Sequence, residues 1–92
     1  MPLLSAAQVT QGLSTIQGWQ VQENTLTKTF TFKDFLAAMR FVNSVAELAE
    51  RAGHHPDIDI RYNKVKLALS SHDAGGITEM DFSLAKEIAK LT

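Results

Sequence analysis

The sequence predicts an α+β fold, in which a four-stranded antiparallel sheet is covered on one face by three helices in the order α-β-β-α-β-β-α. Two pairs of short alternating segments, each joined by a turn-like pair of residues, predict hairpins and therefore antiparallel strands. Apolar residues at helical spacing precede, separate and follow these pairs. Because 92 residues can build one modest core, residues 1–92 are expected to form a single domain.

The first predicted helix starts at Ser5-Ala6-Ala7-Gln8, which has the spacing of a capping box. Apolar residues then follow at helical intervals, at Val9, Leu13 and Ile16. Gly18 is expected just beyond the end of this helix, where glycine is favoured.

A hairpin is predicted after this helix, with the turn-like pair Glu23-Asn24 between its strands. The first strand includes Trp19 and Val21, and the second covers residues 25–32. Threonine occupies every odd position of the second strand up to Thr31. The even positions are Leu26, Lys28, Phe30 and Phe32. Alternation of side-chain type at every second residue, among residues that favour β-structure, is typical of a strand with two different faces.

The longest predicted helix covers residues 33–52 and carries two neighbouring apolar stripes. The first stripe comprises Phe35, Met39, Val42, Ala46 and Ala49. The second comprises Phe41, Val45, Leu48 and Ala52. Since one stripe normally suffices to cover a sheet, the second predicts contact with another subunit. The alternative is a single wide stripe under a strongly twisted sheet. Gly53 and Pro56 predict that the helix ends there.

Residues 57–62 and 64–69 alternate between apolar and polar side chains, and predict a second hairpin with one apolar and one polar face. Asp73-Ala74-Gly75-Gly76 is expected to be a loop that is too short to cradle a phosphate. Thr78 is then expected to cap the last helix. The apolar face of that helix is predicted to carry Met80, Leu84, Ile88 and Leu91.

Composition and charge exclude several classes of protein. The chain is 45% hydrophobic and 21% charged, as in an ordinary globular domain. Nine Lys and Arg against ten Asp and Glu give a net charge of -1 without long runs, which argues against a nucleic-acid or anionic-membrane binder. The absence of Cys excludes disulfides and thiol chemistry. With no signal-peptide features at residues 1–5 and no long apolar stretch, a cytoplasmic protein is expected.

The three histidines are the main candidates for proton transfer near neutral pH: the tandem His54-His55, and His72. Glu50 lies one helical turn before His54, close enough to orient its imidazole. His72 continues the even-numbered positions of its strand, which do not carry the apolar core residues. It is therefore expected on the open face or at the strand's end. The three imidazoles are therefore expected to converge at the rim of the sheet.

Some of these residues also have a purely structural interpretation. A tandem His before Pro56 is typical of a solvated helix terminus that stabilises the helix dipole. Asp81, three residues after Thr78, is most simply the carboxylate of a capping box. Ser70 and Ser71 lack the glycine-flanked elbow of a nucleophile.

No metal site is expected, because adjacent His54 and His55 would struggle to ligate one ion and no His-Glu-x-x-His pattern occurs.

Taken together, these residues resemble the pterin-4a-carbinolamine dehydratase family, also known as the dimerisation cofactor of a homeodomain transcription factor. The anchors of the family pattern are present at the family spacing: Glu50, His54-His55-Pro56, Tyr62, His72 and Asp81. The resemblance extends through Trp19, Phe30-x-Phe32-Lys33-Asp34-Phe35 and Tyr62-Asn63-Lys64-Val65, and covers nearly the whole chain. Ile58 is a departure, since many relatives carry an aromatic residue there; this could alter pterin stacking or selectivity.

The resemblance implies dehydration of 4a-hydroxytetrahydropterin to quinonoid dihydropterin and water, a hydro-lyase reaction that follows turnover of an aromatic amino acid hydroxylase in tetrahydrobiopterin recycling. It implies a homodimer or homotetramer and no metal or organic cofactor. It makes His54 and His72 the candidate acid–base pair and His55 a pterin-binding or stabilising member of the catalytic set. The residues expected to line or support the site are Glu50, Pro56, Ser70, Ser71, Asp73 and Asp81.

The pterin side chain, the assignment of acid and base, and the choice between dimer and tetramer stay open from sequence. The alternative function is a non-catalytic protein-interaction or assembly module of the same family. A nucleic-acid binder built on this sheet would lack a basic patch and stacked aromatic residues.

Overall fold

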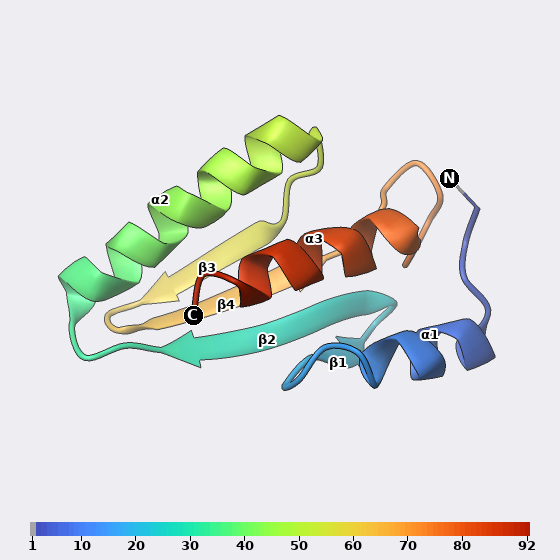
Figure 1. Cartoon of the computed structure of the whole chain (residues 1–92), viewed down its shortest axis with the longest axis horizontal. Helices are drawn as coiled ribbons and strands as arrows, with labels where there is room; N and C mark the ends of the chain where they lie inside the picture. The colour runs from blue at the N-terminus through green and yellow to red at the C-terminus, as the bar shows by residue number, and fades with distance from the viewer. Residues whose placement is uncertain (1) are drawn as a thin grey trace.

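The computed structural model describes residues 2–92 and has the predicted α+β architecture (Figure 1). Its elements are α1 (Ala6–Leu13), β1 (Gln20–Gln22), β2 (Thr25–Thr31), α2 (Phe35–Ala52), β3 (Asp57–Arg61), β4 (Lys64–Leu69) and α3 (Glu79–Ala89). The strands form one sheet in the spatial order β1-β2-β4-β3, and each neighbouring pair is antiparallel. The predicted element order is therefore confirmed.

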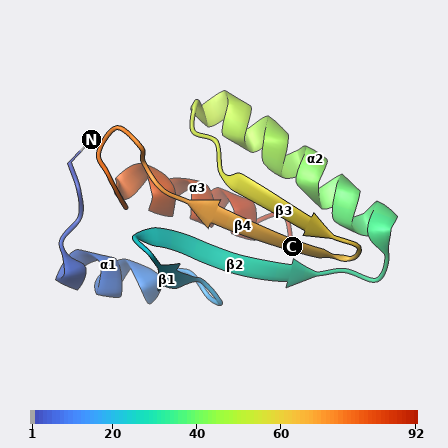
Figure 2. The same cartoon turned by 180° about the vertical axis from the view of Figure 1, so that it is seen from behind.

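The helices cover one face of the sheet, and the other face is left open (Figures 1 and 2). Leu26 of β2 lies opposite Leu69 of β4, and Phe30 lies opposite Val65, so these four side chains project into the same core. α2 and α3 pack against each other above this core. α1 lies close to α3 at Gly12, where an added Cβ would be only 2.5 Å from the Phe82 ring.

α1 is shorter than its apolar spacing predicts. It ends at Leu13, well before Gly18, and Ser14 is its C-cap. The hydroxyls of Ser14 and Thr15 each donate at 2.6 Å to a carbonyl of the preceding turn, at Gln11 and Gly12. These local side-chain bonds satisfy carbonyls that a longer helix would have used, which is how Ser and Thr compete with helix continuation.

Both apolar stripes of α2 contribute side chains to the core of the chain itself. The residues that α2 buries come from both stripes and from the position between them: Ala38, Phe41, Val42, Val45 and Ala49. Val45, from the stripe expected to meet another subunit, is completely buried within the chain itself. One wide stripe is therefore the correct interpretation for the centre of the helix. The large exposed apolar residues of α2 are Phe35 and Leu36 in its first turn.

The buried face of α3 is also rotated from its predicted position. Leu84 and Ile88 are buried as predicted, and Phe82 and Ala85 are buried beside them. Met80 is only half-buried, and Leu91 lies beyond the helix end and is exposed. The carboxylate of Asp81 is buried on this same side of the first helical turn. Within residues 2–92, no helix has the length and hydropathy needed to span a bilayer.

Candidate active site

The site is a hollow of about 560 Å³ where the end of α2, the start of β3 and the end of β4 meet the first turn of α3. The side chains and backbone around it belong to Gly53, His54, His55, Pro56, Asp57, Ser70, Ser71, His72, Asp73, Ala74 and Met80. The tandem His54-His55 and the distant His72 therefore line one hollow, and the convergence expected from their positions is present. Ligand sites of small molecules commonly have volumes of this order.

The end of α2 determines how the tandem histidines are presented. Gly53 has a φ of 65° and closes the helix in the left-handed region, so that the His54 amide donates back to the Ala49 carbonyl at 3.1 Å. The chain then turns sharply into Pro56 and β3. As a result the His54 side chain is only 11% exposed and the His55 side chain is 63% exposed.

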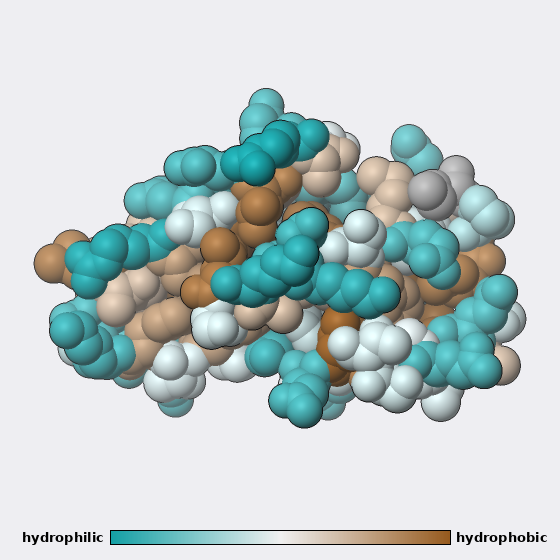
Figure 3. Space-filling model, viewed as in Figure 1, coloured by the Kyte–Doolittle hydropathy of each residue, from teal (hydrophilic) through white to brown (hydrophobic). Residues whose placement is uncertain are grey.

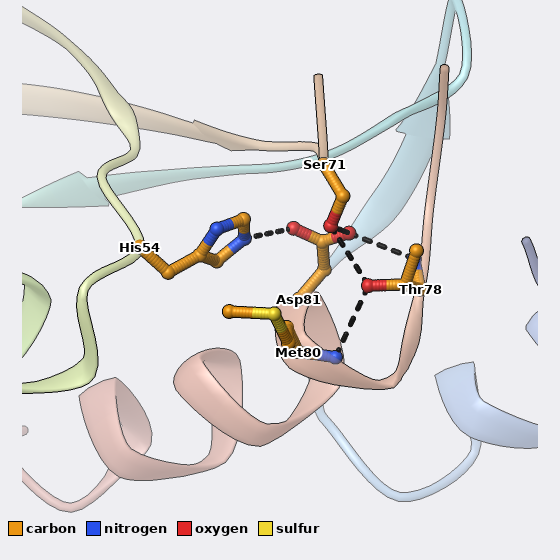
Figure 4. A network of polar contacts seen from close by, with 5 residues as sticks. All are labelled: His54, Ser71, Thr78, Met80 and Asp81. Carbon is orange, nitrogen blue, oxygen red and sulfur yellow. Dashed lines mark hydrogen bonds and ion pairs between the residues drawn. The ribbon is translucent and has the colours of Figure 1, made fainter. Parts of the chain in front are cut away.

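His54 is held by a buried carboxylate (Figure 4). Its Nε2 lies 2.5 Å from Oδ1 of Asp81, whose side chain is fully buried at the start of α3. The other carboxylate oxygen, Oδ2, accepts the Thr78 amide at 2.8 Å and the Ser71 hydroxyl at 3.0 Å. Asp81 therefore closes the predicted capping box and holds a site histidine at the same time.

The hydroxyls beside Asp81 form a hydrogen-bond chain with one consistent direction. Because Ser71 gives its single proton to Asp81, its oxygen accepts the Thr78 hydroxyl proton across 2.7 Å. The Thr78 oxygen in turn accepts the Met80 amide at 3.2 Å. Throughout residues 2–92, every buried side-chain nitrogen and oxygen has a hydrogen-bond partner. A satisfied buried network of this kind fixes its members in one arrangement.

The network also determines which nitrogen of the neutral His54 ring carries the proton. An ionised carboxylate can only accept hydrogen bonds, so the Nε2 atom bound to Asp81 carries the proton. Nδ1 is then the unprotonated nitrogen of the neutral ring. If Nδ1 took up a proton, the adjacent Asp81 carboxylate would stabilise the resulting positive charge. His54 is thus arranged to accept a proton through Nδ1.

Glu50 does not orient His54, contrary to the expectation from helical spacing. Its Oε1 atom lies 2.8 Å from Nε2 of His55, and both side chains are largely exposed. The left-handed Gly53 explains the difference, because the chain leaves the helical path before His54 and swings His55 over Glu50. An exposed pair of this kind contributes about 0–1 kcal/mol to stability, so its main effect is to orient the His55 ring.

His72 lies just beyond the end of β4, as its position in the strand predicts, and it is exposed. Its neighbour Ser71 forms a bridge with Gly76, in which the Ser71 amide donates to the Gly76 carbonyl at 2.8 Å. Gly75 completes this tight turn with a φ of 81°. The turn holds His72 and Asp73 at the mouth of the hollow, while Ser71 points inward to Asp81.

Sequence reasoning missed three contributors to the site. Met80 was predicted to pack in the core, but it lines the hollow, since side chains in a first helical turn lean back toward the helix N-terminus. Thr78 was predicted as a cap and is also a link of the hydroxyl chain. Asp57 has the alternation of a strand residue, and no sequence signal marks it as a wall of the hollow.

Ile58, the departure from the family pattern, does not line the hollow and lies opposite Leu67 on the helix-covered face of the sheet. Within residues 2–92, no group of three or more His, Cys, Asp or Glu side chains is placed to hold a metal ion.

Comparison with known proteins agrees with this arrangement. Residues 2–91 match the family model described as pterin 4 alpha carbinolamine dehydratase. The chain belongs to this family. A relative from Acidobacterium capsulatum is 54% identical over 99% of both chains, and one from Chloroflexus aurantiacus is 53% identical over 99% of this chain and 98% of its own. Both are provisionally named pterin-4-alpha-carbinolamine dehydratase.

Two solved structures are similar to this chain. The crystal structure of a transcriptional coactivator/pterin dehydratase from Brucella melitensis has a TM-score of 0.92, with 32% identity over 96% of both chains. A pterin dehydratase-like protein, identified as a RuBisCO assembly factor in the alpha-carboxysome, has a TM-score of 0.65 and 26% identity. That match covers 79% of this chain and 84% of the other. The fold thus occurs in proteins with different described roles.

Removal of one hydroxyl from this hydrogen-bond chain is expected to lower the free energy of unfolding. Thr78→Val keeps the shape of the side chain but removes both the cap of the Met80 amide and the donor to Ser71. We expect the free energy of unfolding to fall by about 1–3 kcal/mol in urea denaturation. Thr29→Val, at an exposed position of β2, is the matched control and should change it by less than about 0.5 kcal/mol. Equal stabilities for the two variants would contradict this role of Thr78.

Proposed function

We propose that the chain catalyses the dehydration of 4a-hydroxytetrahydropterin to quinonoid dihydropterin and water. The observation that carries this proposal is the gathering of three imidazoles around one hollow, one of them held by a buried carboxylate. Membership of the dehydratase family supports the same reaction class, a carbon–oxygen hydro-lyase. The chain's own residues supply groups for proton transfer, and the proposal requires no metal or organic cofactor.

The reaction needs one proton acceptor and one proton donor. A base removes the proton from N5, and the electrons of that N–H bond form the new C4a=N5 double bond. The C4a–O bond breaks at the same centre, and the departing hydroxyl takes up a proton to leave as water. One proton is taken and one is given, so the enzyme can return to its starting state. Each positioned acid or base typically contributes about 10²–10⁴-fold to the rate.

In this proposal His54 is the base and His72 is the acid. Asp81 on Nε2 favours proton uptake at Nδ1 of His54, because the carboxylate stabilises the imidazolium that forms. His72 is exposed and able to exchange protons with solvent between turnovers. His55, oriented by Glu50, binds the pterin rather than transferring the proton. Pro56, Ser70 and Asp73 shape the walls of the hollow.

The substrate class suggests a place in metabolism. A 4a-hydroxytetrahydropterin is the pterin product of an aromatic amino acid hydroxylase, so such an enzyme would supply the substrate and dehydration would serve tetrahydrobiopterin recycling. The reaction would take place in the cytoplasm, and a direct contact with the hydroxylase is not required, because the substrate can diffuse between the two enzymes.

Replacement of the two proposed acid–base residues tests the function directly. His54→Gln keeps an N–H donor for Asp81 but has no basic nitrogen, and His72→Ala removes the proposed acid. We expect each variant to lower kcat for dehydration of freshly generated 4a-hydroxytetrahydropterin by about 10²–10⁴-fold. Glu47→Ala, exposed on α2 and outside the hollow, should keep the wild-type rate. A folded His54→Gln or His72→Ala enzyme with near-normal kcat would remove that residue from the mechanism.

A non-catalytic interaction or assembly module is the second candidate. The observation in its favour is the similarity to a pterin dehydratase-like protein described as a RuBisCO assembly factor. Exposed apolar side chains of the kind that protein contacts use are Phe35, Leu36, Ile58, Ile60 and Tyr62. A folded protein that leaves dehydration at the rate of buffer alone would favour this candidate over the enzyme.

We also propose that the chain self-associates as a homodimer or homotetramer. β3 is an edge strand of the sheet, so one side of its backbone is free to pair with another strand. Its apolar residues Ile58 and Ile60 share the helix-covered face with the core but stay 36% exposed. Leu36 adds an apolar side chain that is 65% exposed at the start of α2. A second copy would bury these side chains.

A charge on the edge strand is expected to weaken self-association. Ile60→Asp should raise the Kd of the oligomer at least ~10-fold, because the carboxylate would lose water in the interface, and light scattering should show a lower mass. Thr29→Asp, on the open face of β2, is the control and should leave the mass unchanged. Val45 is unsuitable for this test, since its burial in the core means that a charge there would unfold the chain. An unchanged mass for Ile60→Asp would place the interface elsewhere.

A further inference from the structure

The turn between β4 and α3 carries His72, and the position of this ring depends on the backbone of the turn. Of the three imidazoles in the active-site hollow, those of His54 and His55 are each held by a carboxylate. Within residues 2–92, His72 has no such partner, and it is exposed. Whatever holds the turn in place therefore also places His72.

The shape of this turn is fixed by hydrogen bonds within it. The Ser71 carbonyl accepts the amides of Ala74 at 3.1 Å and of Gly75 at 2.9 Å. Ser71 and Gly76 then close the turn as a β-bridge. These bonds move with the turn, so they do not tie it to the rest of the molecule. On the side of the sheet, that tie is the Ser71 hydroxyl, which donates to Asp81.

On the other side, the segment before α1 runs beside the turn (Figures 1 and 2). The Leu4 amide donates to the Ile77 carbonyl at 3.0 Å. Leu3 covers Gly76 so closely that a Cβ added to this glycine would lie 3.0 Å from Cδ2 of Leu3. Leu4 also packs against the hydrophobic core, and Figure 3 shows hydrophobic surface where the segment passes the turn. The segment thus joins the end of the turn to the rest of the chain.

The turn has a hollow on each of its two sides. Residues 70–74 line the active-site hollow. Residues 75–77 line another hollow, of about 470 Å³, which the segment before α1, α1 itself and β1 enclose on the outer side. A loop with few packed neighbours opens more easily than a buried one, so each contact that it makes has a large effect on its position. The lining of the outer hollow is uncharged and comprises Leu3, Leu4, Ala6, Val9, Thr10, Leu13, Val21, Asn24, Gly75, Gly76 and Ile77.

We propose that the segment before α1 is a strap that holds the turn of residues 71–76, and with it His72, at the mouth of the active-site hollow. Leu4 is then a positioning residue, which acts through its backbone bond to Ile77. α1 anchors the strap, because its capping box begins at Ser5, directly after Leu4, and its Gly12 lies against α3. The use of His72 as an acid rests on the proposed function, whereas the hold on the turn does not.

Removal of the Leu4 amide tests the strap. Leu4→Pro deletes the N–H that bonds Ile77, and we expect it to lower kcat for dehydration about tenfold, since a small displacement of a positioned acid is costly. Ala6→Pro is the matched control and should keep the wild-type kcat, because proline is favoured at the first position of a helix. Leu4→Ala keeps the amide and should lower kcat far less than Leu4→Pro.

A second background shows whether the effect acts through His72. In His72→Ala, the group that the strap positions is already missing, so Leu4→Pro should leave the remaining kcat unchanged. The same tenfold loss in both backgrounds would show a general disturbance of the enzyme and would overturn the inference. A Leu4→Pro enzyme with the wild-type kcat would also overturn it.

Hydrogen exchange separates a failure of the strap from a failure of the proposed function. The Ser71 amide donates to the Gly76 carbonyl at 2.8 Å, so its exchange reports opening of the turn without catalysis. It should exchange about tenfold faster in Leu4→Pro than in the wild-type protein or Ala6→Pro, while amides of β2 keep their rates. This result would support the strap even if the wild-type protein dehydrates no pterin. Equal exchange of the Ser71 amide in all three proteins would overturn it.

A milder variant keeps the test decisive if Leu4→Pro does not fold. Leu3→Ala removes the cover of Gly76 and leaves the Leu4 amide in place. It should also speed exchange of the Ser71 amide and lower kcat, by less than Leu4→Pro in each case. A folded Leu3→Ala protein with the wild-type values of both would contradict the strap.

Discussion

The buried carboxylate of Asp81 is the interaction on which both the fold and the site depend. A carboxylate with no exposure to water is costly unless donors surround it, and Asp81 receives them from three places in the chain. Thr78 provides the start of α3, Ser71 the end of β4, and His54 the end of α2. The donors that stabilise this charge thus join two helices and a strand. The same bonds hold His54 through Nε2 and leave its Nδ1 free to act on a ligand.

Local chemistry made much of this structure predictable. The capping boxes at Ser5 and Thr78 and the left-handed Gly53 act within a few residues, and each is present where the sequence indicates. The failures concern partners chosen by tertiary packing. Glu50 pairs with His55 because the chain departs from helical geometry at Gly53, which simple helical spacing ignores. Val45 lies in the core because α2 buries a wide face within the chain. The width of that face depends on tertiary packing, which the periodicity of the sequence does not encode.

Most of the residues around the hollow could be predicted from the sequence, but the hydrogen bonds among them could not. The positions of His54 and His72 indicated that both would lie at the same rim of the sheet, since the end of α2 leads into the strand that pairs with β4. Nothing in those positions shows that His54 binds Asp81 through Nε2. Relatives described as a coactivator/dehydratase and as an assembly factor show how differently one fold can be used.

Asp81 fixes the tautomer of His54 through its bond to Nε2, and ¹⁵N NMR of protein labelled at its histidine rings measures this tautomer directly. At a pH where the ring is neutral, the account predicts a protonated Nε2 and an unprotonated Nδ1 for His54. Asp81→Asn should reverse this, because the amide oxygen would replace Oδ2 toward Thr78 and Ser71 and the amide NH₂ would donate to Nε2. A wild-type His54 protonated on Nδ1, or one that exchanges freely between the two tautomers, would contradict the account.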